Sequence, residues 1–211
     1  DNPVRIALMD VTRNQRLKLL GSIFAEVKIT SFLKYRFSFG ADVVSATTTN
    51  QFPIYNDGFK SRTQYEIRDS RTTYFSPVLT NQLTFEKTFG KHLLNVTAIV
   101  DKQTFRANTL NGSGYRPNND IDELQGVSNP SATSSLDESS LISYVGRLNY
   151  EYAGKYLLSG SIRRDGSSRF APGNKWGTFP SLSLGWRISE EEFLKSIPQI
   201  SELKIRASYG Q

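Results

Sequence analysis

The chain has 211 residues, a net charge of +6, no cysteine and 12% aromatic residues. It contains no apolar run near the ~18 residues that a membrane-spanning helix needs, and without cysteine it can form neither a disulfide framework nor a thiolate metal site. Lys and Arg are scattered along the chain, which argues against nucleic-acid binding. The many Phe, Tyr, Ser, Thr and Asn residues favour strands.

The first part of the chain predicts two strands joined by a short turn. Residues 1–16 have no clear period, so we expect a loop with at most a short strand there. Apolar and polar residues then alternate over residues 18–29 and again over residues 33–43. About 11 residues at roughly 3.3 Å each, tilted by about 45°, climb on the order of 25 Å, which is the height of the apolar band on a membrane barrel.

The middle of the chain predicts two more strands between two long loops. Residues 45–73 and 106–140 are rich in polar residues, and we interpret both segments as loops. Between them, alternating runs cover residues 74–85 and 94–103, and a short turn around Gly90 separates the two runs.

The last third predicts four strands and a short helix. Three alternating runs fill residues 143–188; a tight turn at Gly154 follows the first, and a glycine-rich excursion over residues 166–176 follows the second. The segment SEEEFLKSI then predicts one or two helical turns capped by Ser189, with its glutamates at the positive end of the helix dipole. A final alternating run covers residues 203–209.

The connections alternate between short and long, which is typical of transmembrane barrels. Short turns near Ser31, Gly90 and Gly154 share one side, and the long loops share the other. One face of the strands is apolar, with Tyr and Trp near the strand ends, as in a membrane-facing surface with aromatic girdles. The opposite face is charged, and we expect a lumen there lined by Arg36, Arg147, Arg163, Asp165 and Arg187. The sequence therefore predicts an all-β, antiparallel transmembrane barrel segment of about eight strands.

Two other classes fit the same alternation. A small self-contained outer-membrane barrel with a structural or adhesive role would also have eight strands with one apolar face. A soluble all-β carbohydrate-binding domain would place the charged face in water and the apolar face in a core. Strand length, the placement of the loops and the position of the aromatic residues favour a membrane barrel over the soluble domain.

Three segments carry a resemblance to a known family. GRLNYEYAGKYLLSGSIRRDGSSRF, KWGTFPSLSLGWRISEEEF and LKIRASYGQ closely resemble the central barrel of SusC/RagA-type TonB-dependent outer-membrane transporters of Bacteroidota. The resemblance implies that residues 1–211 are part of a barrel of about 22 strands, with short periplasmic turns and long extracellular loops, whose N-terminal plug and remaining strands lie outside this sequence.

The resemblance also implies a function in the cell outer membrane. The parent protein would be embedded in outer-membrane lipid and import glycan or peptide fragments. A SusD-like surface lipoprotein would act as its lid, and the TonB complex would act through the missing plug. An enzymatic activity and a cofactor are not part of this expectation.

The sequence provides no catalytic constellation. His92 is the single histidine and lies beside a predicted turn, so no histidine triad or histidine metal site can form. Asp120, Asp122 and Glu123 could offer oxygen ligands to calcium, but they lack the spacing of a known calcium loop, and we interpret them as ordinary loop carboxylates.

Candidate ligand contacts come from the predicted outer loops. Aromatic rings and a guanidinium there could stack on, or hydrogen-bond to, an oligosaccharide or peptide; these residues are Tyr55, Phe59, Tyr65, Tyr115 and Arg116. The segment DGSSRF could also touch a ligand. We favour a structural role, in which Asp165 and Arg169 pair and hold this loop against the barrel wall, because the resemblance places the motif in the scaffold.

Overall fold

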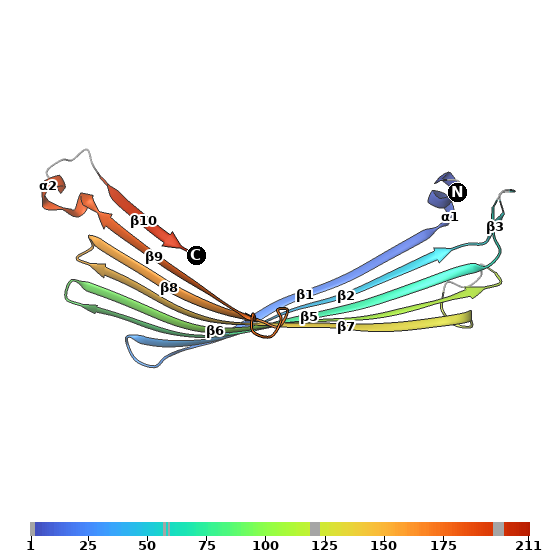
Figure 1. The fold of residues 1–211 in the computed structure, drawn as a ribbon, viewed down its shortest axis with the longest axis horizontal. Coiled ribbons are helices and arrows are strands. Elements are labelled where there is room, and N and C mark those ends of the chain that lie inside the picture. The colour runs from blue at the N-terminus through green and yellow to red at the C-terminus, as the bar shows by residue number, and fades with distance from the viewer. Residues whose placement is uncertain (1–2, 57, 59, 119–122, 196–200) are drawn as a thin grey trace. The chain divides into compact units, whose positions relative to one another are not determined.

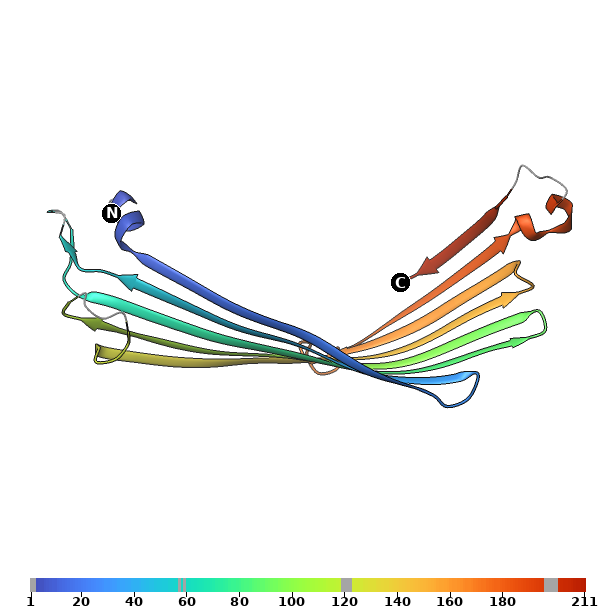
Figure 2. The same ribbon diagram turned by 180° about the vertical axis from the view of Figure 1, so that it is seen from behind.

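A computed structural model describes residues 3–56, 58, 60–118, 123–195 and 201–211. Its main element is an eight-stranded antiparallel sheet with the order β1-β2-β5-β6-β7-β8-β9-β10, so neighbours in the sheet follow chain order (Figure 1 and, from behind, Figure 2). The small strands β3 and β4 form a hairpin of their own. The elements are α1 (Pro3–Met9), β1 (Val11–Lys28), β2 (Leu33–Phe52), β3 (Tyr55–Asn56), β4 (Ser61–Arg62), β5 (Tyr65–Phe89), β6 (His92–Arg116), β7 (Ser128–Tyr152), β8 (Tyr156–Ser167), β9 (Trp176–Arg187), η1 (Ile188–Glu190), α2 (Glu192–Lys195) and β10 (Lys204–Gly210).

The sheet confirms the predicted fold class and the expected number of strands. β1 and β10 are its two edges in the described part of the chain. None of the described helices combines the length and the hydrophobicity needed to cross a membrane.

The chain divides into two compact units. The first consists of Asp1–Gly21, Ala41–Ser76 and Phe105–Glu138, and the second of Ser22–Gly40, Pro77–Thr104 and Ser139–Gln211. The second unit contains the short turns, and the first contains the β3–β4 hairpin and the connection between β6 and β7.

The register of the second unit separates two faces row by row. Leu148 pairs with Gly160, which pairs with Leu182. One residue further along, Arg147 pairs with Ser161, which pairs with Ser181. Because successive side chains of a strand point to opposite faces, these rows define an apolar face and a polar face. This separation confirms the predicted alternation.

The short turns form where backbone conformations allow the chain to reverse. Ala153 and Gly154 both have positive φ, 53° and 73°, and the amide of Lys155 donates to the carbonyl of Tyr152 at 2.9 Å. Two consecutive positive φ values are the mark of the type I′ turn, whose twist matches that of the flanking strands. Gly90, with φ 58°, makes the corresponding reversal between β5 and β6.

The predicted loops over residues 45–73 and 106–140 are wrong for most of their length. β2 continues to Phe52, β5 begins at Tyr65, β6 ends at Arg116 and β7 begins at Ser128. Hydroxyl and amide side chains connect these polar strand parts, as between Thr72 and Thr109 at 3.0 Å. A strand can form backbone hydrogen bonds with its neighbours when polar side chains lie on both of its faces. The polar composition of these segments resembles that of a loop, so the sequence did not reveal the strands.

The chain start and the connector before β10 also differ from prediction. Residues 1–16 include α1 and the first part of β1 instead of a loop. Ser189 does not cap a helix, because it lies inside η1, where Arg187 is the N-cap residue and makes no side-chain cap hydrogen bond. α2 comprises only Glu192–Lys195, and residues 196 and 197 of the predicted helix lie outside the described residues.

Candidate functional site

A polar groove of about 290 Å³ lies in the first unit. Its walls are built mainly of short hydroxyl and amide side chains, contributed by β2, β5, β6 and β7. The lining residues are Asn50, Arg68, Asp69, Ser70, Asn111, Gly112, Ser113, Ser131 and Thr133.

Cross-strand pairing aligns the groove side chains. The amide of Asn111 on β6 donates to the hydroxyl of Thr133 on β7 at 3.5 Å. Next to the groove, the hydroxyl of Thr12 on β1 donates to the amide oxygen of Asn50 on β2 at 2.9 Å. Residues on extended, paired strands have fixed backbone positions, so the groove presents a preformed set of donors and acceptors.

One of the two charged side chains of the groove is paired, and the other has a buried oxygen without a hydrogen bond in the described part of the chain. Arg68 donates through Nε to Glu66 at 2.6 Å. Asp69 Oδ1 is buried and accepts no hydrogen bond from the described residues. The hydroxyl and amide side chains of the lining suit a neutral ligand with many hydroxyl or amide groups.

The predicted ligand contact Tyr55 belongs to a basic and aromatic cluster in the first unit. The guanidinium of Arg5 lies 3.4 Å from the centroid of the Tyr55 ring, and that of Arg62 lies 5.3 Å from it. Arg62 also forms an ion pair with Asp10 at 3.0 Å. One face of the Tyr55 ring is therefore occupied by a cation at van der Waals distance.

Two other predicted contacts, Tyr65 and Arg116, are buried. Tyr65 is 2% exposed and Arg116 is 5% exposed. Arg116 Nη2 donates to the carbonyl oxygens of Glu123 and Gln125, so its guanidinium holds the connection between β6 and β7. The carbonyl of Tyr115 accepts from the Ser128 hydroxyl at 3.0 Å.

Phe59 lies outside the described residues. Ligand contact by Tyr55, Phe59, Tyr65, Tyr115 and Arg116 stays a prediction.

The β6–β7 connection packs on two glycines of β6. A Cβ at Gly112 would approach Leu124 Cδ1 to 2.7 Å, and a Cβ at Gly114 would approach the Cβ of Val127 to 2.6 Å. Gly112 and Gly114 alternate with Asn111 and Ser113 of the polar groove. This alternation places Leu124 and Val127 of the connection on the face of β6 opposite to the side chains of Asn111 and Ser113.

The charged residues predicted for the lumen lie on the polar face of the second unit, where several have partners. Arg163 donates to Asp165 at 2.8 Å and to the Ser143 hydroxyl at 3.3 Å. Arg187 donates to the Gly154 carbonyl at 2.9 Å and to Glu151 at 3.5 Å.

Arg36 lies over the ring of Phe24 at 4.0 Å, whereas Arg147 is exposed. The DGSSRF loop is joined to β7, since the Ser168 amide donates to the Ser140 carbonyl at 2.9 Å. The Asp165–Arg169 pairing stays a prediction.

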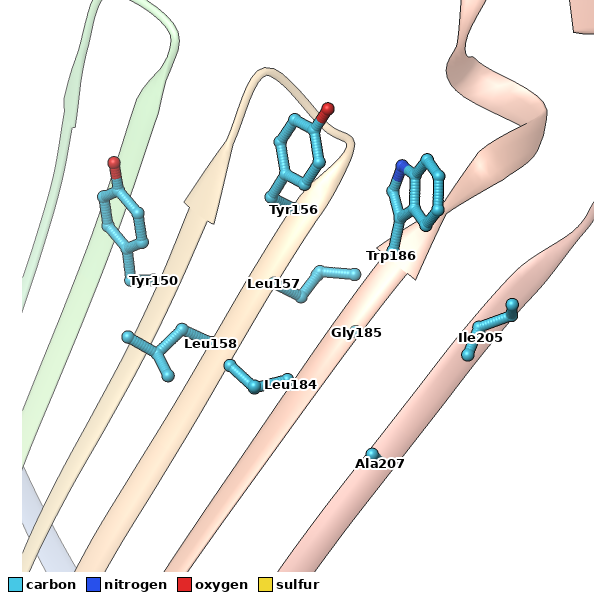
Figure 3. A pocket seen from close by; sticks show the side chains of 9 residues that line it. All are labelled: Tyr150, Tyr156, Leu157, Leu158, Leu184, Gly185, Trp186, Ile205 and Ala207. Atoms are coloured by element: carbon cyan, nitrogen blue, oxygen red, sulfur yellow. The ribbon is translucent and has the colours of Figure 1, made fainter.

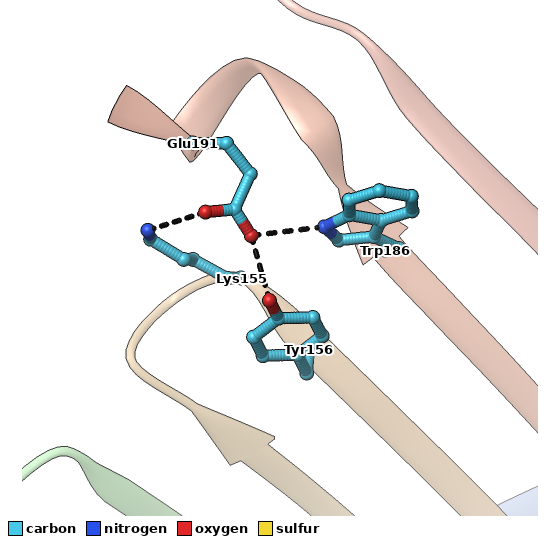
Figure 4. A network of polar contacts seen from close by, with 4 residues as sticks. All are labelled: Lys155, Tyr156, Trp186 and Glu191. Atoms are coloured by element: carbon cyan, nitrogen blue, oxygen red, sulfur yellow. Dashed lines mark hydrogen bonds and ion pairs between the residues drawn. The ribbon is translucent and has the colours of Figure 1, made fainter. Parts of the chain in front are cut away.

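Glu191 connects the ends of β8 and β9 to the connector that follows them (Figure 4). Its carboxylate accepts from Lys155 Nζ at 2.7 Å, from the Tyr156 hydroxyl at 2.7 Å and from Trp186 Nε1 at 3.1 Å. The hydrogen bonds from Lys155, Tyr156 and Trp186 lower the pKa of Glu191 to about 2. The hydrogen bond to Glu191 raises the pKa of Lys155.

We expect the E191Q substitution to weaken this connection in a pH-dependent way. A carboxylate whose pKa falls from 4.5 to about 2 on folding contributes stability that is fully present above pH 4.5 and is lost as the pH falls toward 2. In the full-length protein, the thermal unfolding temperature of wild type should therefore exceed that of E191Q at pH 7, and the difference should shrink between pH 4.5 and pH 2. The neighbouring E190Q variant is the control, and an E191Q deficit that does not change with pH would contradict this role.

An apolar groove of about 420 Å³ lies on the second unit (Figure 3). It has no charged lining residue, and Figure 3 shows aliphatic side chains below the rings of Tyr150, Tyr156 and Trp186. The rings of Tyr156 and Trp186 are stacked, with centroids 6.4 Å apart. The lining residues are Tyr150, Tyr156, Leu157, Leu158, Leu184, Gly185, Trp186, Ile205 and Ala207.

Among the described residues, no group of three His, Cys, Asp or Glu side chains could hold a metal ion. His92 Nδ1 lies 2.6 Å from the Tyr150 hydroxyl. Asp120 and Asp122, the carboxylates weighed for calcium, lie outside the described residues.

Comparison with known proteins identifies the family. The family model described as TonB dependent receptor-like, beta-barrel matches residues 11–211. TonB-dependent receptor P3 of Formosa agariphila is 30% identical over 223 aligned positions, which cover 100% of this chain and 21% of that protein. TonB-dependent receptor SusC of Bacteroides thetaiotaomicron is 51% identical over 78 residues, or 37% of this chain and 8% of SusC.

Solved structures share the fold. The structure of the RagAB peptide transporter aligns with a TM-score of 0.82 at 21% identity, over 97% of this chain and 23% of that chain. The chain spans about a fifth of the length of the curated relatives that match it from end to end. The chain belongs to the TonB-dependent receptor family, and the part of that family that it matches is the β-barrel.

Proposed function

We propose that this chain is a wall segment of an outer-membrane importer that takes up nutrients with energy from TonB. The observation that carries the proposal is the row-by-row separation of an apolar face from a polar face in a chain of this family. A single sheet whose apolar face bears exposed Leu, Ile and aromatic side chains needs an apolar environment on that side, and lipid provides it.

The dimensions of the apolar face support a position in the membrane. On β9, Trp176 and Trp186 stand at opposite ends of the apolar residues of the strand. Ten residue steps at roughly 3.3 Å, tilted by about 45°, give a band of about 23 Å, close to that of an outer-membrane barrel. The apolar groove in Figure 3 then faces acyl chains at the end of this band where the short turns lie.

The substrate is proposed to be an oligosaccharide or a peptide fragment. Hydroxyl and amide side chains in the polar groove suit a neutral polar ligand. The similarity to the RagAB peptide transporter supports the peptide class, and the similarity to SusC and RagAB supports a SusD-like surface lipoprotein as partner. These similarities favour the importer over a self-contained adhesive barrel or a soluble carbohydrate-binding domain.

Gene deletion tests the proposed function. In the source bacterium, loss of the full-length gene should abolish growth on one class of oligosaccharide or peptide as sole carbon source. Wild-type gene on a plasmid should restore growth, and a second strain without a working TonB complex should fail to grow on the same substrate. Unchanged uptake of every oligosaccharide and peptide in the deletion strain would contradict the proposal.

A further inference from the structure

The apolar face of the second unit has an asymmetric distribution of charge. In the described strands of this unit, the positions on the apolar face include no Asp or Glu. The Lys and Arg residues on this face are Lys87, near the short turns, and Lys102 and Arg164, near the level of Trp176. The two ends of the apolar band are therefore basic, and Lys102 and Arg164 form the larger group.

The register brings Lys102 and Arg164 into neighbouring rows. Tyr144 pairs with Arg164, and Gly166 pairs with both Ile142 and Trp176. The Ala153 amide donates to the Lys91 carbonyl at 2.7 Å, which pairs residue 153 of the turn with residue 91. Because β6 and β7 run antiparallel, the same register pairs Ile142 on β7 with Lys102 on β6. Lys102 thus stands in the row of Trp176, and Arg164 stands in the next row toward the middle of the band.

An aromatic platform accompanies the two cations. The rings of Tyr144 and Trp176 are stacked, with centroids 6.1 Å apart, and the guanidinium carbon of Arg164 lies 5.0 Å from the centroid of the Trp176 ring. A Cβ at position 166 would lie 2.8 Å from the Trp176 ring, so glycine there lets the indole lie flat on β8. Trp176 is nevertheless 48% exposed, which leaves ring surface for a ligand.

We infer that Lys102, Arg164, Tyr144 and Trp176 bind the phosphorylated sugar headgroup of a lipid in the outer leaflet. Lys and Arg provide charge-assisted hydrogen bonds to phosphate, and an exposed aromatic face suits a sugar ring. The position at the edge of the apolar band, with no Asp or Glu on this face of the described strands of the second unit, fits an amphiphile whose acyl chains cover the Leu and Val side chains below. This inference rests on the proposed membrane position and is independent of the transported substrate.

Lipid retention by the full-length transporter tests the inference. Wild type and the double variant K102Q/R164Q are delipidated in detergent, incubated with phosphorylated lipid A and analysed by native mass spectrometry. Loss of two basic residues at a lipid headgroup should lower the bound fraction roughly ten-fold or more. Dephosphorylated lipid A should bind wild type no better than it binds the variant, and millimolar inorganic phosphate should not displace phosphorylated lipid A.

The controls separate this site from general charge effects and from misfolding. R147Q/R206Q removes the same charge from exposed positions on the polar face and should retain the lipid like wild type. K102R/R164K preserves both charges and should also retain it, and heat-modifiable gel mobility reports whether each barrel is folded. Equal retention of phosphorylated lipid A by folded K102Q/R164Q and wild type would overturn the inference, as would displacement by inorganic phosphate. Either result would leave the uptake phenotype of the gene deletion unaffected.

Discussion

The L182R substitution is expected to prevent the full-length transporter from accumulating as a folded barrel. Leu182 is 51% exposed on the apolar face, where it pairs with Gly160 on β8 and Tyr209 on β10. It lies between Trp176 and Trp186, far from either end of the band. A lipid-facing arginine near the bilayer midplane costs about 2–4 kcal/mol, which is a large share of the stability of a protein. The folded fraction in outer-membrane preparations, measured by heat-modifiable gel mobility, should fall strongly.

The adjacent residue provides a matched control for this prediction. Ser183 lies on the polar face, paired with Ser159 and Ser208, whose small side chains leave room for a longer neighbour. S183R adds the same side chain one residue away and should fold in nearly normal amount. Similar folded amounts of L182R and S183R would show that the apolar face does not contact lipid.

The R116A substitution is expected to release the connection between β6 and β7. Arg116 is almost fully buried, and its guanidinium donates to two carbonyls of that connection. Hydrogen bonds to a charged group are worth about 1.5–3 kcal/mol each, so the local loss should be about 3 kcal/mol or more. Limited proteolysis of the full-length protein should then cut within residues 123–127, while the rest of the barrel stays resistant.

A second arginine in the same unit tests whether burial is the cause. Arg71 on β5 is exposed, so R71A removes the same side chain without releasing a buried segment. The protease resistance of R71A should equal that of wild type. If R116A were equally resistant, the two carbonyl contacts would not be what holds the connection in place.

The sequence predicted the apolar and polar faces of the strands but misjudged how far the strands extend. Alternation of Leu, Phe and Tyr with charged residues reveals a strand because one face must avoid water. The strand parts around Asn50, Thr72 and Asn111 have polar residues on both faces, so their composition resembles that of a loop. Ser, Thr and Asn do recur at every second position near Asn111 and Thr133, and this was the signal that could have identified the groove.

Contacts between distant residues explain the other differences. The role of Arg116 depends on carbonyl groups, which the amino-acid sequence does not distinguish. Glu191 was interpreted as part of a helix start, yet its partners Lys155 and Tyr156 precede it by 36 and 35 residues. No local pattern relates residues so far apart before the order of the strands is known.

The groove on the polar parts of β2, β5, β6 and β7 has a consequence for how substrate preference can change. When a residue on a paired strand is substituted, the new side chain starts from the same backbone position, because the hydrogen bonds between the strands fix the backbone there. New preferences can then arise through single substitutions at positions such as Asn111 or Thr133. Leu124 and Val127 of the connection between β6 and β7 lie on the opposite face of β6, and added loop length costs little loop-closure entropy where these contacts are kept. Diversification of the ligand surface and variation in loop length are therefore separable in this segment.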